Sequence, residues 1–193
     1  MNFFTRRVVV LFALLCTTLM GLASETNWVS LFNGRDLTGW QVVNDGAFTV
    51  TNGTFHIEGG MGWLRSENQF GDFVLEAGWR GLETNYNSGF FVRSGLAGKP
   101  FPDGGWQVNL KQSALGALVK GKDVVQPSKT PARPVGEWTQ FRIEARGKLL
   151  TLFVNDEKAW EYADLEPARG FIGIQAEGKR MEFRNLRLRK LDQ

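Results

Sequence analysis

Hydrophobic and polar residues alternate in short runs along this chain, and glycine, asparagine or aspartate separate the runs. In residues 73–80, for example, Phe73, Leu75, Ala77 and Trp79 fall on one side of an extended segment. A period of two residues predicts half-buried β-strands. Since no stretch carries a long helical period, the pattern predicts an all-β protein.

The same alternation predicts strands over residues 47–50, 54–57, 73–80, 87–93, 106–110, 139–146, 149–154, 158–162, 171–176 and 181–188. Many short strands without helices between them are typical of a two-sheet antiparallel sandwich or jelly roll. Asn52 and Gly53 tolerate positive φ and predict a hairpin. The apolar residues after Phe183 fall out of phase, which predicts a bulge near Arg184 and Asn185.

The first 23 residues have the pattern of a secretory signal peptide. Basic residues Arg6 and Arg7 precede an apolar run over 8–20, and small residues lead to a predicted cleavage after Ala23. The alternative is a retained membrane anchor, but the run is short for a span of about 20 apolar residues. We therefore expect a signal peptide over 1–23 and a single jelly-roll domain over 24–193, located in the periplasm or outside the cell.

Removal of the predicted signal changes the charge and the thiol content. Arg6 and Arg7 leave 21 of the 23 basic residues to face 20 acidic ones. A chain this close to neutral is not expected to be attracted to nucleic acid or to anionic lipid. After cleavage of the signal we expect no insertion into a membrane. The single cysteine, Cys16, also lies in the signal, so the mature chain offers no disulfide, thiolate nucleophile or cysteine metal ligand.

Amide and cationic residues recur at alternate positions of two neighbouring predicted strands. Asn87 and Arg93 belong to one, and Gln107, Asn109 and Lys111 to the other. Because strand side chains alternate between faces, these residues are expected to share one surface. Such a surface suits a sugar ligand, whose hydroxyl groups both donate and accept hydrogen bonds. Buried polar residues within apolar strands are also costly unless they have partners.

Five longer segments carry a family resemblance. They are SLFNGRDLTGW (30–40), GWLRSENQFGDFVLEAGWR (62–80), NSGFFVR (87–93), GEWTQFRIEARG (136–147) and IGIQAEGKRMEFRNLRLR (172–189). In this order they resemble the domain-of-unknown-function 1080 family, also called the 3-keto-disaccharide hydrolase domain. The resemblance covers nearly the whole predicted mature chain. It implies a concanavalin A-like jelly roll, secretion, and action on 3-keto glycosides or related sugars.

The implied chemistry needs a base, enolate donors and a partner for the leaving oxygen. A ketone at C3 acidifies the hydrogen on C2, so that a base can remove it and expel the glycosidic oxygen. Arg93, Asn87 and Gln107 are candidate donors, and a divalent cation could replace them at the enolate. Relatives commonly carry a carboxylate where Gln107 or Asn109 stands here. An amide cannot act as a base, so this strand holds sugar hydroxyls at most.

Three residues remain as candidate bases. His56 is the only histidine, but apolar neighbours make a solvent-facing strand residue the alternative. Glu76 shares a strand face with Arg80, where a surface ion pair is the alternative to a site. Glu177 follows the strand at 171–176, where a solvated loop carboxylate is the alternative. The sequence does not choose among them.

Aromatic residues near the predicted site have two interpretations. Trp63 lies between glycines and beside Arg65, so it could stack on a sugar ring or pack in the core. Tyr86 could cap the site from its loop. Trp106 alternates with Gln107 and is expected in the core.

Several mechanisms lack their motifs. The chain has no paired-carboxylate strand, no G-x-S-x-G elbow and no zinc-ligand cluster. No cofactor is required, although a hard divalent cation leaves no clear sequence signature. Three functions follow: a secreted glycosidic-bond-cleaving enzyme acting on the concave sheet face, a non-catalytic carbohydrate-binding module of the same fold, or a scaffold in the cell envelope. The first two predict a sugar or oxidised sugar as ligand, while sugar identity, metal dependence and oligomeric state stay open.

Overall fold

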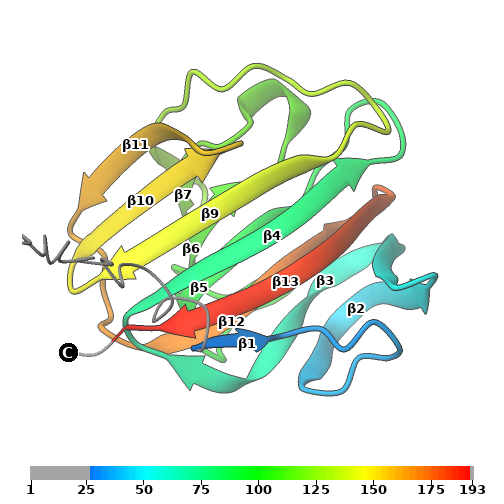
Figure 1. Cartoon of the computed structure of the whole chain (residues 1–193), viewed down its shortest axis with the longest axis horizontal. Helices are drawn as coiled ribbons and strands as arrows, with labels where there is room; N and C mark the ends of the chain where they lie inside the picture. Colours follow the sequence, from blue (N-terminus) through cyan, green and yellow to red (C-terminus); the bar gives the residue numbers. More distant parts are fainter. Residues whose placement is uncertain (1–26, 192–193) are drawn as a thin grey trace, which may run out of the picture.

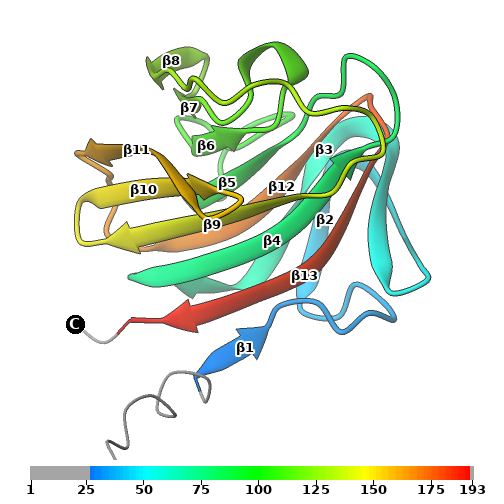
Figure 2. The same ribbon diagram turned by 45° about the horizontal axis from the view of Figure 1, so that its top comes forward.

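The computed structural model describes residues 27–191 of the 193-residue chain, and this part is almost entirely β. It forms thirteen strands and one short 3-10 helix, η1 (Gln112–Ala114). Figure 1 shows β4, β9 and β13 in one layer, in front of a second layer that contains β5, β6 and β12. The tilted view in Figure 2 shows the same two layers more nearly from the side. The predicted all-β sandwich is confirmed.

The first sheet contains, in spatial order, β11 (Glu157–Ala163), β10 (Leu149–Val154), β9 (Thr139–Arg146), β4 (Phe73–Gly81) and β13 (Met181–Lys190), with β1 (Trp28–Ser30) paired to β13. The second sheet contains β2 (Trp40–Thr51), β3 (Thr54–Phe70), β12 (Gly170–Glu177), β5 (Gly89–Ser94), β6 (Trp106–Asn109), β7 (Leu118–Lys120) and β8 (Asp123–Gln126). All pairs are antiparallel, as the jelly-roll prediction requires.

Strand β3 joins the two sheets. Its residues 55–57 pair with β13 of the first sheet, and residues 61–70 pair with β12 of the second. Between these segments, Gly59 and Gly60 adopt φ values of 144° and 86°, which residues with a Cβ rarely reach. The two glycines therefore let one continuous strand turn from one layer into the other.

Aromatic side chains from both sheets fill the space between the layers. Phe90 of β5 packs edge-on against Phe183 of β13, with ring centroids 5.7 Å apart, and also contacts Phe141 of β9. Trp106 of β6 contacts Tyr162 of β11 at 5.3 Å. Each large aromatic ring removes about 150–250 Å² from water, so these contacts make up much of the force that holds the sheets together.

The predicted turns and bulge are confirmed. Asn52 and Gly53 form the β2–β3 turn with φ values of 51° and 75°. The register between β13 and β4 shifts between Arg184 and Arg187, where Asn185 has φ 53°. Residues 61–70 were not predicted as a strand. The predicted signal peptide, 1–23, lies outside the described residues. Within 27–191, no helix is long and apolar enough to cross a membrane.

Candidate functional site

Strand β6 places part of the predicted polar set on the outer face of the second sheet. Trp106, Val108 and Leu110 point into the core. Gln107 and Asn109, at the alternate positions, therefore point outward, and Lys111 follows them as an exposed residue. Of the five polar residues predicted to share one surface, these three lie on this side of the sheet.

A glycine on β5 allows a side-chain bond between two strands that are not adjacent. Strand β5 lies between β6 and β12 in the sheet. The Gln107 amide crosses over Gly89 and donates from Nε2 to Oε1 of Gln175 at 2.6 Å. A Cβ at Gly89 would lie 2.4 Å from that Nε2 atom. The missing side chain at position 89 is therefore what brings the two amides together.

Glu177 lies at the end of a row of hydrogen-bonded side chains that begins with the amides of Gln107 and Gln175, which we call the amide row. Gln175 Nε2 donates to Glu177 Oε2 at 2.9 Å, and the Asn87 side chain forms a second hydrogen bond with this carboxylate. Burial raises the pKa of Glu177 above its ordinary value, while the charge of Lys111 and the Asn87 bond oppose that change. A carboxylate with a raised pKa, in contact with amides and near one cation, has the properties of a general acid or base.

An aromatic cluster borders the amides on the same face. The Trp63 ring lies over Gly173, where a Cβ would approach it within 2.3 Å, and meets Phe91 edge-on at 5.6 Å. Phe101, from the loop after β5, contacts Phe91 in turn. Trp63 is therefore only 1% exposed. The prediction of an open stacking platform at Trp63 is wrong, because neighbouring rings cover the indole.

Arg65 also lies on this face, paired across β3 and β12 with Gly173. Its guanidinium lies 4.6 Å from the centroid of the Phe171 ring and donates a hydrogen bond to Gln41. The Arg65 Nε atom is buried without a partner. Arg65 is thus placed next to the aromatic cluster, and its proposed role in ligand binding stays a prediction.

Arg93 does not belong to this surface. Its side chain is fully buried and lies at one end of the sandwich, where Nε donates to Gly71 O at 3.0 Å and Nη1 to Gly147 O at 2.6 Å. Its Nη2 atom bonds to Asp72 Oδ1 at 2.8 Å. Nη1 also donates to Pro167 O at 3.5 Å. The predicted ligand contact is therefore wrong, because the guanidinium joins the β3–β4, β9–β10 and β11–β12 connections of the fold.

Tyr86 is also a packing residue rather than a cap. It is fully buried against Trp79, with centroids 5.7 Å apart, and its hydroxyl bonds to both backbone groups of Arg133. Burial raises the pKa of Tyr86. The predicted cap is wrong in this respect, although Tyr86 lines a cavity of about 340 Å³ that also borders Lys111.

The other two candidate bases lie on the outer face of the first sheet. The Nδ1 atom of His56 lies 3.5 Å from Oε1 of Glu182, and its Nε2 atom lies 2.8 Å from the Thr54 hydroxyl. Glu76 pairs with Arg187 at 2.7 Å. The alternative of a Glu76–Arg80 pair is wrong, because Arg80 bonds to Glu182 at 2.5 Å. His56 and Glu76 therefore cannot act together with the amide row.

Sequence reasoning missed Gly89 and Gln175. Both were visible as alternate positions of predicted strands, but pairing them requires knowing that β12 lies next to β5. Among residues 27–191, no group of three or more His, Cys, Asp or Glu side chains could hold a metal ion. A divalent cation at this site stays an untested prediction.

Comparisons with known proteins agree with a carbohydrate-related domain. Residues 27–189 match the model of a family described as the 3-keto-alpha-glucoside-1,2-lyase-like domain. A search of curated proteins found no match. Similar solved structures include a candidate glycosyl hydrolase from Parabacteroides distasonis, with 19% identity, a TM-score of 0.73, and coverage of 86% of this chain and 94% of that chain.

Two Bacillus subtilis structures are also similar. The carbohydrate-binding module CBM66 has 20% identity, a TM-score of 0.68, and coverage of 79% of this chain and 96% of that chain. A protein of unknown function with a galectin-like fold has 11% identity, a TM-score of 0.65, and coverage of 84% and 94%. At these identities the similarity establishes the fold, a jelly roll shared by hydrolase-like and sugar-binding proteins.

Proposed function

Because the chain belongs to the 3-keto-alpha-glucoside-1,2-lyase-like domain family, we propose that it is a secreted protein that cleaves a glycosidic bond in a 3-keto glycoside or disaccharide. The observation that carries this proposal is the position of Glu177, whose pKa is raised, at the end of an amide row on one sheet face. Export rests on the signal-like segment over 1–23.

The first step is proton removal from carbon. The Glu177 carboxylate takes the proton from C2, and the electron pair of that bond forms an enolate with the C3 carbonyl. Collapse of the enolate re-forms the carbonyl, makes a double bond between C1 and C2, and breaks the bond from C1 to the glycosidic oxygen. The leaving oxygen takes up the proton that Glu177 removed. Addition of water across the new double bond, with a proton of that water delivered to C2, completes an apparent hydrolysis.

Neighbouring side chains supply the stabilising contacts. Lys111 is placed to favour negative charge developing on the enolate oxygen, because it already interacts with the Glu177 carboxylate. Asn87 and Gln107 provide amide groups that hydroxyl groups can bond. Burial of Glu177 brings its pKa closer to neutral pH, which is the condition for efficient proton transfer by a carboxylate.

A non-catalytic sugar-binding module is the second candidate. The specific observation in its favour is that Gln107 and Asn109 are amides where the family resemblance implies a carboxylate. The fold similarity to CBM66 is compatible with this alternative. Both candidates use the same face, so they differ in whether Glu177 performs chemistry.

Parallel binding and turnover assays distinguish the two candidates. Purified protein, Glu177→Gln and Glu76→Gln are incubated with 3-keto-trehalose, with EDTA or with added Mg²⁺ or Ca²⁺, and the products are followed by NMR. The enzyme proposal predicts loss of turnover by about 10²-fold or more in Glu177→Gln, with sugar binding retained. Glu76→Gln is the matched control on the opposite face and should leave turnover unchanged. Binding without product in every condition would assign the module.

A further inference from the structure

The outer face of the first sheet contains a cleft that the proposed function does not use. Its volume is about 510 Å³, within the range of about 300–1,000 Å³ that small-molecule sites occupy. It is lined by Glu76, Gln140, Arg142, Asp156, Asn185 and Arg187. These residues come from β4, β9, β13 and the β10–β11 turn, across the sandwich from Glu177.

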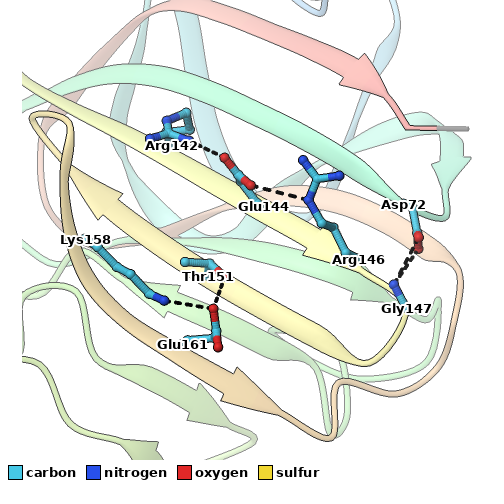
Figure 3. A network of polar contacts seen from close by, with 8 residues as sticks. All are labelled: Asp72, Arg142, Glu144, Arg146, Gly147, Thr151, Lys158 and Glu161. Carbon is cyan, nitrogen blue, oxygen red and sulfur yellow. Dashed lines mark hydrogen bonds and ion pairs between the residues drawn. The ribbon is translucent and has the colours of Figure 1, made fainter.

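Three of the four charged groups of the cleft are held by neighbouring side chains. Arg187 donates from Nε and approaches with Nη2, each 2.7 Å from a single oxygen of Glu76, Oε2. The Arg142 guanidinium lies 3.6 Å from the centroid of the Phe153 ring and bonds to Glu144. Figure 3 shows Glu144 between Arg142 and Arg146 along β9. A ligand would therefore meet preorganised donors and acceptors.

The β10–β11 turn and the β13 bulge carry polar side chains that have no partner in the part of the chain that the structure describes. The Asn155 carboxamide accepts a hydrogen bond from Gln140 N at 2.9 Å and so fixes the turn that carries Asp156 beside β9. Asn185 stands in the β13 bulge with φ 53°, a conformation that redirects its side chain. Within residues 27–191, no hydrogen-bond partner is found for the side-chain amides of Gln140 and Asn185, and no ion-pair partner for Asp156.

A glycine leaves room for two neighbouring side chains on the adjoining surface. Gly78 lies between Glu76 and Arg80 on the outward side of β4 and is paired with Gln140. A Cβ at this position would lie 3.4 Å from Oε1 of Gln140 and 3.2 Å from Cγ of Arg184. Gly78 thus leaves room for these two side chains, as Gly89 leaves room for an amide on the opposite face.

The charges and hydrogen-bonding groups that line the cleft indicate which class of ligand it favours. Two arginines and two carboxylates cancel in formal charge, and the two amides offer both donors and acceptors. An anion would be repelled by Glu76 and Asp156, and a cation would be repelled by Arg142 and Arg187. The cleft therefore favours neither an anionic nor a cationic ligand. A sugar hydroxyl donates and accepts at once. We propose that this cleft is a second saccharide site, which binds a neutral oligosaccharide without cleaving it.

The proposal is tested by NMR on the full mature protein labelled with ¹⁵N. Cellopentaose, maltopentaose and laminaripentaose are titrated separately, with a glucuronic acid-containing disaccharide as the anionic arm. The expected result is a saturable shift of the side-chain amide signals of Gln140 and Asn185 with at least one neutral sugar. Glu177→Gln, on the other face, should leave that shift unchanged.

Matched variants make the result decisive. Gln140→Ala and Asn185→Gly should each weaken binding about tenfold. This is the loss expected when one hydrogen bond worth about 1.4 kcal/mol is removed. Glycine keeps the positive φ of position 185, so a folding defect is not expected. The proposal is overturned if no neutral sugar shifts these signals, if only the anionic sugar does, or if the shifts disappear in Glu177→Gln.

Discussion

At the scale of single residues, Arg93 shows how a polar residue within an apolar strand can serve the fold. The guanidinium donates to carbonyls of the β3–β4 and β9–β10 turns and to the Asp72 carboxylate, which also accepts from Gly147 N (Figure 3). Burial lowers the pKa of Arg93, and the charge of Asp72 opposes that effect. The arginine satisfies backbone groups that would otherwise be buried without partners.

Arg93→Ala is expected to lower the free energy of unfolding by about 3–5 kcal/mol, because one side of a buried ion pair and several carbonyls lose their partner. Urea denaturation measures this change. Arg93→Lys should recover only part, since an ammonium group cannot present the planar fork. Lys148→Ala, which removes an exposed pair with Glu166, is the control and should leave the midpoint unchanged. A stable Arg93→Ala protein that no longer binds sugar would contradict this role.

The raised pKa of Glu177 makes a second prediction with a definite sign. Because the folded pKa is higher than the unfolded one, the folded state binds this proton more tightly and loses stability as pH rises through the folded pKa. Glu177→Gln should therefore be more stable than the parent at pH 7. The gain should vanish below the unperturbed glutamate pKa of about 4.3. Denaturation midpoints at pH 4 and pH 7 test this.

A carboxylate with the opposite shift provides the control. The backbone hydrogen bond from Arg180 lowers the pKa of Glu83, so the stability it contributes is present at neutral pH and is lost as pH falls through the folded pKa. Glu83→Gln should accordingly be less stable than the parent at pH 7. A loss of stability at pH 7 in Glu177→Gln would show that its carboxylate is held by favourable contacts, contrary to this account.

At the scale of elements, strand β5 shapes the candidate site because it has no side chain at Gly89. The strand lies between β6 and β12, and Gly89 lets Gln107 reach Gln175 across it. Gly89→Ala would place a Cβ 2.5 Å from Cδ of Gln107. The flexible side chain should swing away, break the amide pair and release Gln175 from its fixed position beside Glu177.

The expected outcome for Gly89→Ala is a loss of sugar affinity of about tenfold, equivalent to about 1.4 kcal/mol, with little change in melting temperature. Isothermal titration calorimetry with 3-keto-trehalose measures the affinity in the Glu177→Gln background, in which the sugar is expected to bind without being cleaved. Gly95→Ala is the matched control, because no atom lies within 4 Å of its Cβ and no positive φ is required. Unchanged affinity in Gly89→Ala would remove the amide pair from the binding site.

Elements could be predicted where one face is apolar and the other polar. Strand β4 follows this rule, since Phe73 and Leu75 are in the core and Glu76 lies outward. Residues 61–70 of β3 do not, because Trp63 and Leu64 are adjacent and both buried: the aromatic cluster covers the outer face there. A period of two disappears when both faces of a strand are covered.

At the scale of the whole molecule, the sandwich has two outer faces, and the sequence alone does not show on which of them an outward residue lies. Alternation correctly placed Gln107 and Glu76 on outward positions, but which sheet each strand joins depends on pairing between distant segments. Only the assembled order β12–β5–β6 brings Glu177 to the amides, and only β4–β13 brings Glu76 to Arg187. The fold was therefore predictable, and the site was predictable only in part.

The two outer faces also differ in chemistry. The second sheet presents amides, one partly buried carboxylate and an aromatic cluster, whereas the first presents paired arginines and glutamates. Because the core separates the faces, changes on one should leave ligand binding on the other intact. This independence is what makes each face a control for the other.

The most direct test of the central claim follows hydrogen at C2 of the sugar. Cleavage of 3-keto-trehalose is run in D₂O, and the released 3-keto sugar is analysed by mass spectrometry and NMR. Removal of the C2 proton by Glu177 predicts one deuterium at C2 with the parent protein and with Glu76→Gln, and neither cleavage nor exchange with Glu177→Gln. Cleavage without deuterium at C2, or equal exchange with Glu177→Gln, would contradict the account.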